Sequence, residues 1–233
     1  MAEYSKFDQF DAPGYSEAYR ADRVYQLLGE LLERYVKEGM KVVDLGSGAS
    51  VPVAVWMAQH RHGVELHLFE PSRMAEGAAQ LLSQLSGGPY HLHRLAAHQF
   101  SQALPEGFDL LVCNRMLHEW RLADLERTGK WDLTAVLSQA CSGLRPAGVV
   151  VMGDFAFPAG LAPERINASM EAMLKRFGHT HPPDHFIQPE SAAAALESAG
   201  LEILEEDRLE RPEPDTDRFY WFLVARKLRV AIR

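Results

Sequence analysis

One short stretch, residues 40–50, constrains the fold of this chain more than any other. It begins as Met40-Lys41-Val42-Val43-Asp44-Leu45 and continues as Gly46-Ser47-Gly48-Ala49-Ser50. A mostly apolar run that is bounded by glycines is typical of a strand buried in a parallel sheet. Gly46 and Gly48 then allow a sharp turn in which backbone N–H groups come close to a ligand. A helix is predicted from Ser50 onward, and Pro52 suits its first turn. The sequence therefore predicts a strand, a glycine turn and a helix N-terminus, which together can hold a polar or charged group.

A second acidic residue narrows the kind of ligand. The next predicted strand, residues 64–70, ends at Glu70, which lies 26 positions after Asp44. This is where a nucleotide-binding βαβ unit places the carboxylate that binds a ribose diol. The turn reads Asp44-x-Gly46-x-Gly48 rather than G-x-G-x-x-G. A carboxylate at this position repels a pyrophosphate and suits a ligand that carries an ammonium or sulfonium group.

These features resemble the class I S-adenosylmethionine-dependent methyltransferases of the small-molecule type. The first motif of that family is a strand ending in D/E-x-G-x-G, and its second is an acidic residue at the end of the next strand. Residues 108–118, FDLLVCNRMLH, resemble the family's F-D-x-V-x-x-x-x-x-L-H stretch. Arg145-Pro146-Ala147-Gly148 resembles the turn before the family's fifth strand, with Ala147 in place of a glycine. The resemblance covers residues 39–153, and the last strands match by pattern.

The resemblance implies an α/β fold. We expect a Rossmann-like seven-stranded, mostly parallel sheet with helices on both faces, an antiparallel last strand and a small helical lid insert. Residues 1–233 would form a single methyltransferase domain. Within it, residues 1–38 would be an N-terminal cap segment and helix, and residues 159–187 the lid-like insert.

The resemblance also assigns S-adenosylmethionine as the cofactor and gives a set of residues that would bind it. The methionine part would lie on the glycine turn, the ribose against the second acid, and the adenine beside the third strand. The methionyl end or the pocket mouth would lie beyond the fourth strand. The residues are Asp44, Gly46, Ser47, Gly48, Glu70, Pro71, Ala97, His98, Asn114 and Arg115.

His118 is the candidate general base, because it follows the fourth strand and an imidazole titrates near neutral pH. The alternative is a structural hydrogen bond at the start of a helix. If this segment is helical, we expect Glu119 to point away from His118. The candidate substrate contacts are the aromatic residues of the first segment and polar or aromatic residues beyond the fourth and fifth strands. They are Tyr15, Tyr19, Glu119, Trp120 and Asp154.

A histidine cluster raises the question of a metal. His179, His181 and His185 with Asp184 offer imidazole and carboxylate ligands that suit zinc or iron. Pro182 and Pro183 make this loop stiff, and no further ligand is evident. We therefore predict no metal.

Methyl transfer to an oxygen or nitrogen atom of a small molecule is the favoured function. Residues 10–16 also resemble the start of carboxy-S-adenosylmethionine synthases, which is the alternative among enzymes. A non-catalytic module that binds S-adenosylmethionine or S-adenosylhomocysteine is a third option. A dehydrogenase is opposed by Asp44 and by the missing third glycine.

Composition limits the partners and the compartment. The net charge of −8 argues against nucleic acid as the main partner. No apolar stretch approaches the length of a membrane span, and residues 1–11 do not resemble a signal peptide. The chain has two cysteines, Cys113 and Cys141, in predicted structural elements, which favours reduced thiols and the cytoplasm. A homodimer is left open.

Overall fold

The structure is a computed structural model. It describes the chain except for residues 1–22, 61–62, 87, 97–98, 104–106, 179, 211, 214 and 229–233. Four predictions fall outside the described residues: the cap segment, Tyr15 and Tyr19 within it, the adenine contacts Ala97 and His98, and His179. The predicted N-terminal helix is described from Arg23 onward.

Seven strands form one sheet in the order β3-β2-β1-β4-β5-β7-β6. The pairs among β1 to β5 are parallel, whereas β7 runs antiparallel to both β5 and β6. This confirms the predicted Rossmann-like sheet. The strands are β1 (Lys41–Leu45), β2 (Glu65–Phe69), β3 (Tyr90–His93), β4 (Phe108–Asn114), β5 (Leu144–Ala156), β6 (Leu201–Leu209) and β7 (Phe219–Lys227).

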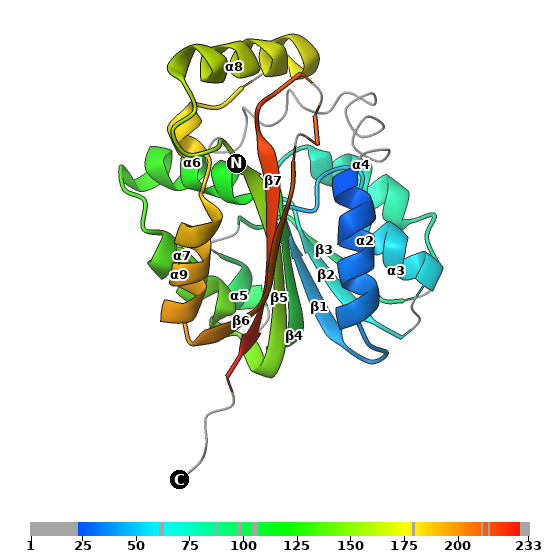
Figure 1. Ribbon diagram of the computed structural model, residues 1–233. Helices are drawn as coiled ribbons and strands as arrows, with labels where there is room; N and C mark the ends of the chain where they lie inside the picture. The colour runs from blue at the N-terminus through cyan, green and yellow to red at the C-terminus, as the bar shows by residue number, and fades with distance from the viewer. Residues whose placement is uncertain are drawn as a thin grey trace.

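Helices cover both faces of the sheet (Figure 1), as predicted. They are α2 (Arg23–Tyr35), α3 (Pro52–His60), α4 (Met74–Leu82), α5 (Phe100–Ala103), α6 (Leu117–Thr128), α7 (Leu133–Ser142), α8 (Pro163–Phe177), α9 (Pro189–Ser198) and the 3-10 turn η3 (Pro183–His185). None of the helices in the described part of the chain is long and apolar enough to cross a bilayer.

The core follows the alternation of side chains along the strands. On β1, Val42 faces the cluster that includes Leu28 of α2 and Met57 of α3. Its neighbour Val43 faces the opposite cluster, with Leu137 of α7 and Leu196 of α9. Both faces of β1 are buried from Val42 to Leu45, and Asp44 is the one acid among these buried positions.

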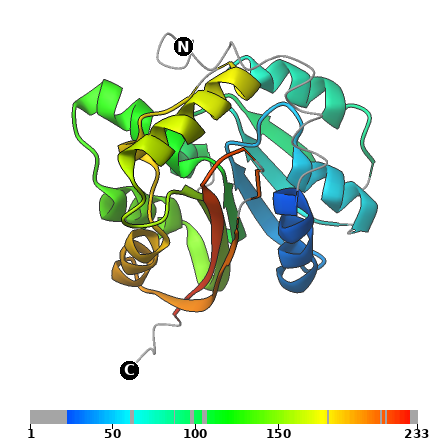
Figure 2. The ribbon, with the colours of Figure 1, turned by 45° about the horizontal axis from the view of Figure 1, so that its top comes forward.

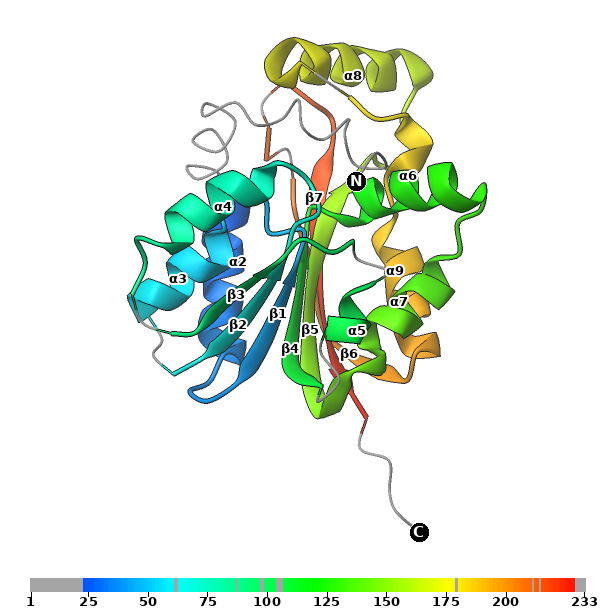
Figure 3. The same ribbon diagram turned by 180° about the vertical axis from the view of Figure 1, so that it is seen from behind.

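The strand order reverses between β1 and β4, which lie side by side although β2 and β3 come between them in sequence. In open α/β sheets, ligands bind beyond the carboxyl ends of the strands at such a point. The helix α8 lies beyond this end of the sheet in both the front and the back view (Figures 1 and 3). Figure 2 turns this end toward the viewer and shows α8 across it. The predicted insert thus forms a helix near the expected pocket, and its role as a lid stays a prediction.

Candidate active site

The site begins where β1 and β2 end side by side. The register pairs Asp44 with Leu68 and Leu45 with Phe69, so the turn after β1 meets the end of β2. The backbone N–H groups of Gly46 and Ser47 donate to the Phe69 carbonyl, with N···O distances of 2.9 and 3.3 Å. The N–H of Gly48 donates to Glu70 Oε2 at 3.0 Å. The second acid therefore lies directly against the glycine turn, as the two motifs predicted.

Both glycines of the turn have a left-handed backbone, with φ of +72° at Gly46 and +60° at Gly48. A Cβ added to Gly46 would lie 2.4 Å from Cγ of Met116, whereas one added to Gly48 would meet nothing within 4 Å. The first glycine is thus required by packing against the segment after β4. The second borders open space, which is the property needed for close approach of a ligand.

Asp44 is the most perturbed group of the turn. Its side chain is 3% exposed, and burial, followed by the nearby charge of Glu70, raises its pKa to about 7. Its Oδ2 and the Ser47 hydroxyl are buried and lack a hydrogen-bond partner among the described residues. A buried carboxylate oxygen without a donor is costly, so this position fits a ligand that brings a donor or a positive charge.

Glu70 is also buried, but its carboxylate is held by its neighbours. In addition to Gly48, the backbone N–H and hydroxyl of Ser72 donate to its Oε1 at 3.0 and 2.6 Å. Burial raises the pKa of Glu70, and these hydrogen bonds oppose the rise. Ser72 thus fixes the orientation of the acid at the end of β2. The adjacent Pro71 is half-buried.

The end of β4 places Asn114 and Arg115 next to β5 and β7. The hydroxyl of Tyr220, on β7, donates to Asn114 Oδ1 at 2.8 Å. Arg115 has a left-handed φ of +56°, and its N–H donates to the Gly153 carbonyl at 2.7 Å. Its guanidinium carbon lies 4.9 Å from the ring centre of Tyr25 and 5.1 Å from that of Phe155. Arg115 is therefore held between α2 and the end of β5.

His118 and Asp154 form a buried pair. His118 Nδ1 lies 2.7 Å from Asp154 Oδ1, and the His118 backbone N–H donates to Oδ2 at 3.0 Å. Because a carboxylate only accepts, the proton lies on Nδ1, and Nε2 is left as the basic nitrogen. Burial lowers the pKa of His118, but the charge and hydrogen bond of Asp154, together with Glu119, outweigh it and raise the pKa. Asp154 is fully buried and is directed at His118, so its predicted contact with a substrate stays a prediction.

Glu119 does not point away from His118, contrary to our expectation for a helix. Its Oε1 lies 3.6 Å from His118 Nε2 and 2.9 Å from His181 Nε2. The long glutamate side chain reaches sideways because His181 approaches from the segment before η3. The rings of His118 and His181 pack edge to face, and their centres lie 5.0 Å apart. One ligand atom from each of these three residues lies within 4.8 Å of the others, so they are a second possible metal-binding group.

Trp120 was predicted as a substrate contact, but the structure buries it in the core cluster on the α7 and α9 face. The buried indole N–H has no hydrogen-bond partner among the described residues. Its direct contact with a substrate therefore stays a prediction, and its observed role is packing in this cluster.

Residues that the sequence analysis did not select complete the surroundings of His118. The ring centre of Phe186 lies 5.5 Å from His118 and 5.5 Å from Phe157. The guanidinium carbon of Arg218 lies 4.2 Å from the Phe155 ring centre and 5.3 Å from that of Phe186. Arg218 is buried and paired with Glu213. These contacts join the residue after η3 and the residue before β7 to the end of β5. No local sequence pattern reveals them.

The comparisons with known proteins agree with this geometry. A family model described as "Methyltransferase domain" matches residues 17–206, which is most of the chain. The chain therefore belongs to the methyltransferase domain family, as its class I motifs predicted. Its cofactor is S-adenosylmethionine. No curated protein sequence matches the chain significantly.

Solved structures share the fold at low sequence identity. The cyclopropane synthase MmaA2 from Mycobacterium tuberculosis is 12% identical, with a TM-score of 0.65 and coverage of 87% of this chain and 84% of that one. Magnesium protoporphyrin IX methyltransferase (ChlM) from Synechocystis PCC 6803, solved with bound SAH, is 17% identical, with a TM-score of 0.57 and coverage of 88% and 81%. The [4+2]-cyclase SpnF is 16% identical, with a TM-score of 0.64 and the same coverage of 88% and 81%. These neighbours support the fold and leave the reaction open.

Proposed function

We propose that this protein transfers a methyl group from S-adenosylmethionine to an oxygen or nitrogen atom of a small molecule, with His118 as the general base. The observation that carries the proposal is the buried pair of His118, which follows β4, and Asp154, near the carboxyl end of β5. A histidine oriented by a carboxylate through one nitrogen, with the other nitrogen basic, is suited to take a proton from a hydroxyl or amine.

The cofactor-binding residues fit the proposed ligand. The unpartnered Oδ2 of Asp44 and hydroxyl of Ser47 would hold the amino acid part. Glu70, braced by Ser72, would hold the ribose hydroxyls. When bound, S-adenosylmethionine supplies an activated methyl group on a sulfonium. The protein must then align the acceptor with that methyl group and exclude water.

The chain offers an apolar and cationic wall for the acceptor. Phe155, Phe157 and Phe186 are each at most 5% exposed, and His118 packs on the last of them. The guanidinium of Arg115 lies over the Phe155 ring. This arrangement suits an acceptor with a flat or apolar body whose reacting hydroxyl or amine reaches His118 Nε2.

The proposed setting is the cytoplasm, with a small-molecule acceptor and without nucleic acid; a homodimer stays open. Cys113 and Cys141 are buried free thiols, and burial raises the pKa of Cys141 to about 12. Thiols kept protonated in the core are compatible with a reducing compartment.

Turnover is the first test. The parent protein with S-adenosylmethionine and pools of hydroxylated and amino metabolites should release S-adenosylhomocysteine. Mass spectrometry should show an acceptor that is 14 mass units heavier, as one CH₂ is added. Tight cofactor binding without product from any pool would favour a binding module instead. A carboxylated nucleoside product would favour a carboxy-S-adenosylmethionine synthase.

The pH dependence of the rate tests His118. Because its pKa is raised, the rate should increase with pH through that raised pKa, as the neutral ring accumulates. Asp154→Asn removes the charge that raises the pKa, so the increase should move to lower pH and the maximal rate should fall about 10²-fold or more. His60→Ala, at an exposed position on α3, is the matched control and should behave as the parent. A parent-like pH profile in Asp154→Asn would show that His118 is structural.

A further inference from the structure

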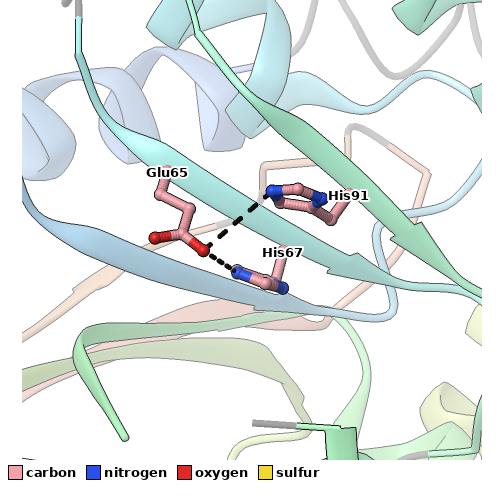
Figure 4. A group of neighbouring side chains, drawn as sticks. All are labelled: Glu65, His67 and His91. Carbon is pink, nitrogen blue, oxygen red and sulfur yellow. Dashed lines mark hydrogen bonds and ion pairs between the residues drawn. The ribbon is translucent and has the colours of Figure 1, made fainter. Parts of the chain in front are cut away.

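A group of polar side chains lies outside the proposed methyl-transfer site, on one face of the strands β2 and β3. Glu65 and His67 are two positions apart on β2 and therefore project from the same face. The parallel register places His91 of β3 beside His67. Figure 4 shows the three side chains turned toward one another, with dashed lines from Glu65 to both rings. In Figure 3 these strands are seen directly, with α2 behind them.

The distances are close to those of a metal site. Glu65 Oε1 lies 2.8 Å from His67 Nε2 and 4.0 Å from His91 Nε2. One ligand atom from each residue lies within 4.8 Å of the others. Ligands bonded to zinc at about 2.0–2.1 Å in a tetrahedron are about 3.3 Å apart. Shifts of about an ångström would therefore complete the site, and His91, with 46% of its side chain exposed, can make the largest of them.

The group also has a second layer of contacts. His67 Nδ1 lies 2.9 Å from His93 Nε2. A metal-binding histidine normally donates its other N–H to such an acceptor, which fixes the ring and its tautomer. His67 stacks on His91 at 4.6 Å, and His93 stacks on Phe69 at 4.6 Å. His93, which is not a proposed ligand, thus already orients the His67 ring.

The group supplies the kinds of ligand atom that zinc accepts. They are one carboxylate oxygen from Glu65 and one imidazole nitrogen each from His67 and His91. The ammonium group of Lys41 would compete with a metal ion for Glu65, because Lys41 Nζ lies 3.5 Å from Glu65 Oε1. It would have to move aside when the ion binds.

We propose that Glu65, His67 and His91 form a binding site for a divalent transition metal ion of the zinc type, with an open fourth position toward solvent. Two imidazoles and one carboxylate are a ligand set that zinc uses when it keeps a position for water. The ion would bind His67 Nε2 in place of the hydrogen bond to Glu65. His67 would then carry its proton on Nδ1 and donate to His93 Nε2, and His93 would carry its own proton on Nδ1.

Such an ion would join β2 to the edge strand β3. Both strands run toward the cofactor pocket, and the Glu70 N–H donates to the His93 carbonyl at 3.0 Å. The metal would therefore stabilise the part of the sheet that positions the ribose-binding acid, without contributing a group to the reaction.

The test uses full-length, tag-free protein stripped of metal with a chelator and titrated with Zn²⁺ by calorimetry. We expect one Zn²⁺ per chain from this group, and a rise in melting temperature of about 5–10 °C at a hundredfold excess over Kd. Co²⁺ should give the visible absorption of a four-coordinate ion. His91→Ala, which removes an exposed ligand, should weaken binding at least tenfold and, at the same Zn²⁺ concentration, reduce the thermal shift to about half or less. His93→Ala should weaken binding about 10–100-fold through loss of the second contact.

Two controls decide where a bound ion lies. His60→Ala removes an unrelated exposed histidine, and His181→Ala breaks the other possible group, formed by His118, Glu119 and His181. Both should retain the ion at the sheet. The proposal is wrong if the parent binds no Zn²⁺ at about 100 μM, or if Glu65→Gln and His91→Ala bind like the parent. It is equally wrong if the ion is lost only in His181→Ala.

Discussion

The buried carboxylate of Asp44 makes a prediction that separates stability from function. Its pKa is raised from 3.8 to about 7, so the folded protein holds a proton that the unfolded chain releases above pH 4. A group whose folded pKa is raised in this way, when it is an acid, destabilises the fold as pH rises. We expect Asp44→Asn, which removes this titration, to make the ligand-free protein more stable at pH 8 and to weaken binding of S-adenosylmethionine more than tenfold.

The magnitude follows from the two pKa values. A shift from 3.8 to about 7 costs the folded state roughly 1.7 kcal/mol at pH 5 and roughly 4.3 kcal/mol at pH 8. The difference, about 2.6 kcal/mol, corresponds to roughly 5–10 °C in melting temperature for a chain of this size. Asparagine also leaves a buried polar group at this position, and its cost is the same at both pH values. The change in the stability difference between pH 5 and pH 8 therefore reports the titration of Asp44 alone.

Urea unfolding of the parent and of Asp44→Asn at pH 5 and pH 8 measures this quantity directly. The stability difference between the two proteins should grow by about 2–3 kcal/mol from pH 5 to pH 8. Glu206→Gln, an exposed acid-to-amide change on β6, should show no such growth. A pH-independent difference would refute the claim that Asp44 is a strained, buried acid kept for a ligand.

Two further predictions concern backbone positions. Gly153→Ala should lower the free energy of unfolding, measured in urea, by about 2 kcal/mol or more. The added Cβ would lie 1.9 Å from the Tyr220 hydroxyl and 2.9 Å from the Trp221 carbonyl. Stability equal to that of the parent would mean that β5 and β7 pack differently. Ala147→Gly should raise the free energy of unfolding by about 0.5–1 kcal/mol, because Ala147 has a φ of +66°. A loss of stability on this change would argue against the left-handed turn.

The sequence predicted the sheet well where strands are continuous and apolar. β4 spans Phe108–Asn114, which is the mostly apolar run that begins the FDLLVCNRMLH stretch. The fifth strand was predicted to begin at Val149, but it begins at Leu144. Arg145-Pro146-Ala147-Gly148 looks like a turn and instead continues the strand through a left-handed residue, at a point where the pairing with β4 shifts register.

The parts of the site that depend on local motifs could be predicted from the sequence. The parts that depend on contacts between residues far apart in the sequence could not. Asp44, the glycines and Glu70 follow strands, so their meeting is set by parallel pairing alone. His118 was identified from the segment after β4, but its partner Asp154 lies 36 positions later. The contact of Glu119 with His181 depends on how the segment before η3 returns over α6. The bounds of α6 were not predicted, because polar residues such as Asp124 are buried on it and blur its amphipathic pattern.

A structure of the protein with S-adenosylhomocysteine bound tests the central claim most directly. The account predicts the ribose hydroxyls against Glu70 and the amino acid part against Asp44 and the turn of Gly46 to Gly48. Density for the nucleoside at any other place, or a diphosphate resting on the glycine turn in a competing soak with NAD, would contradict it.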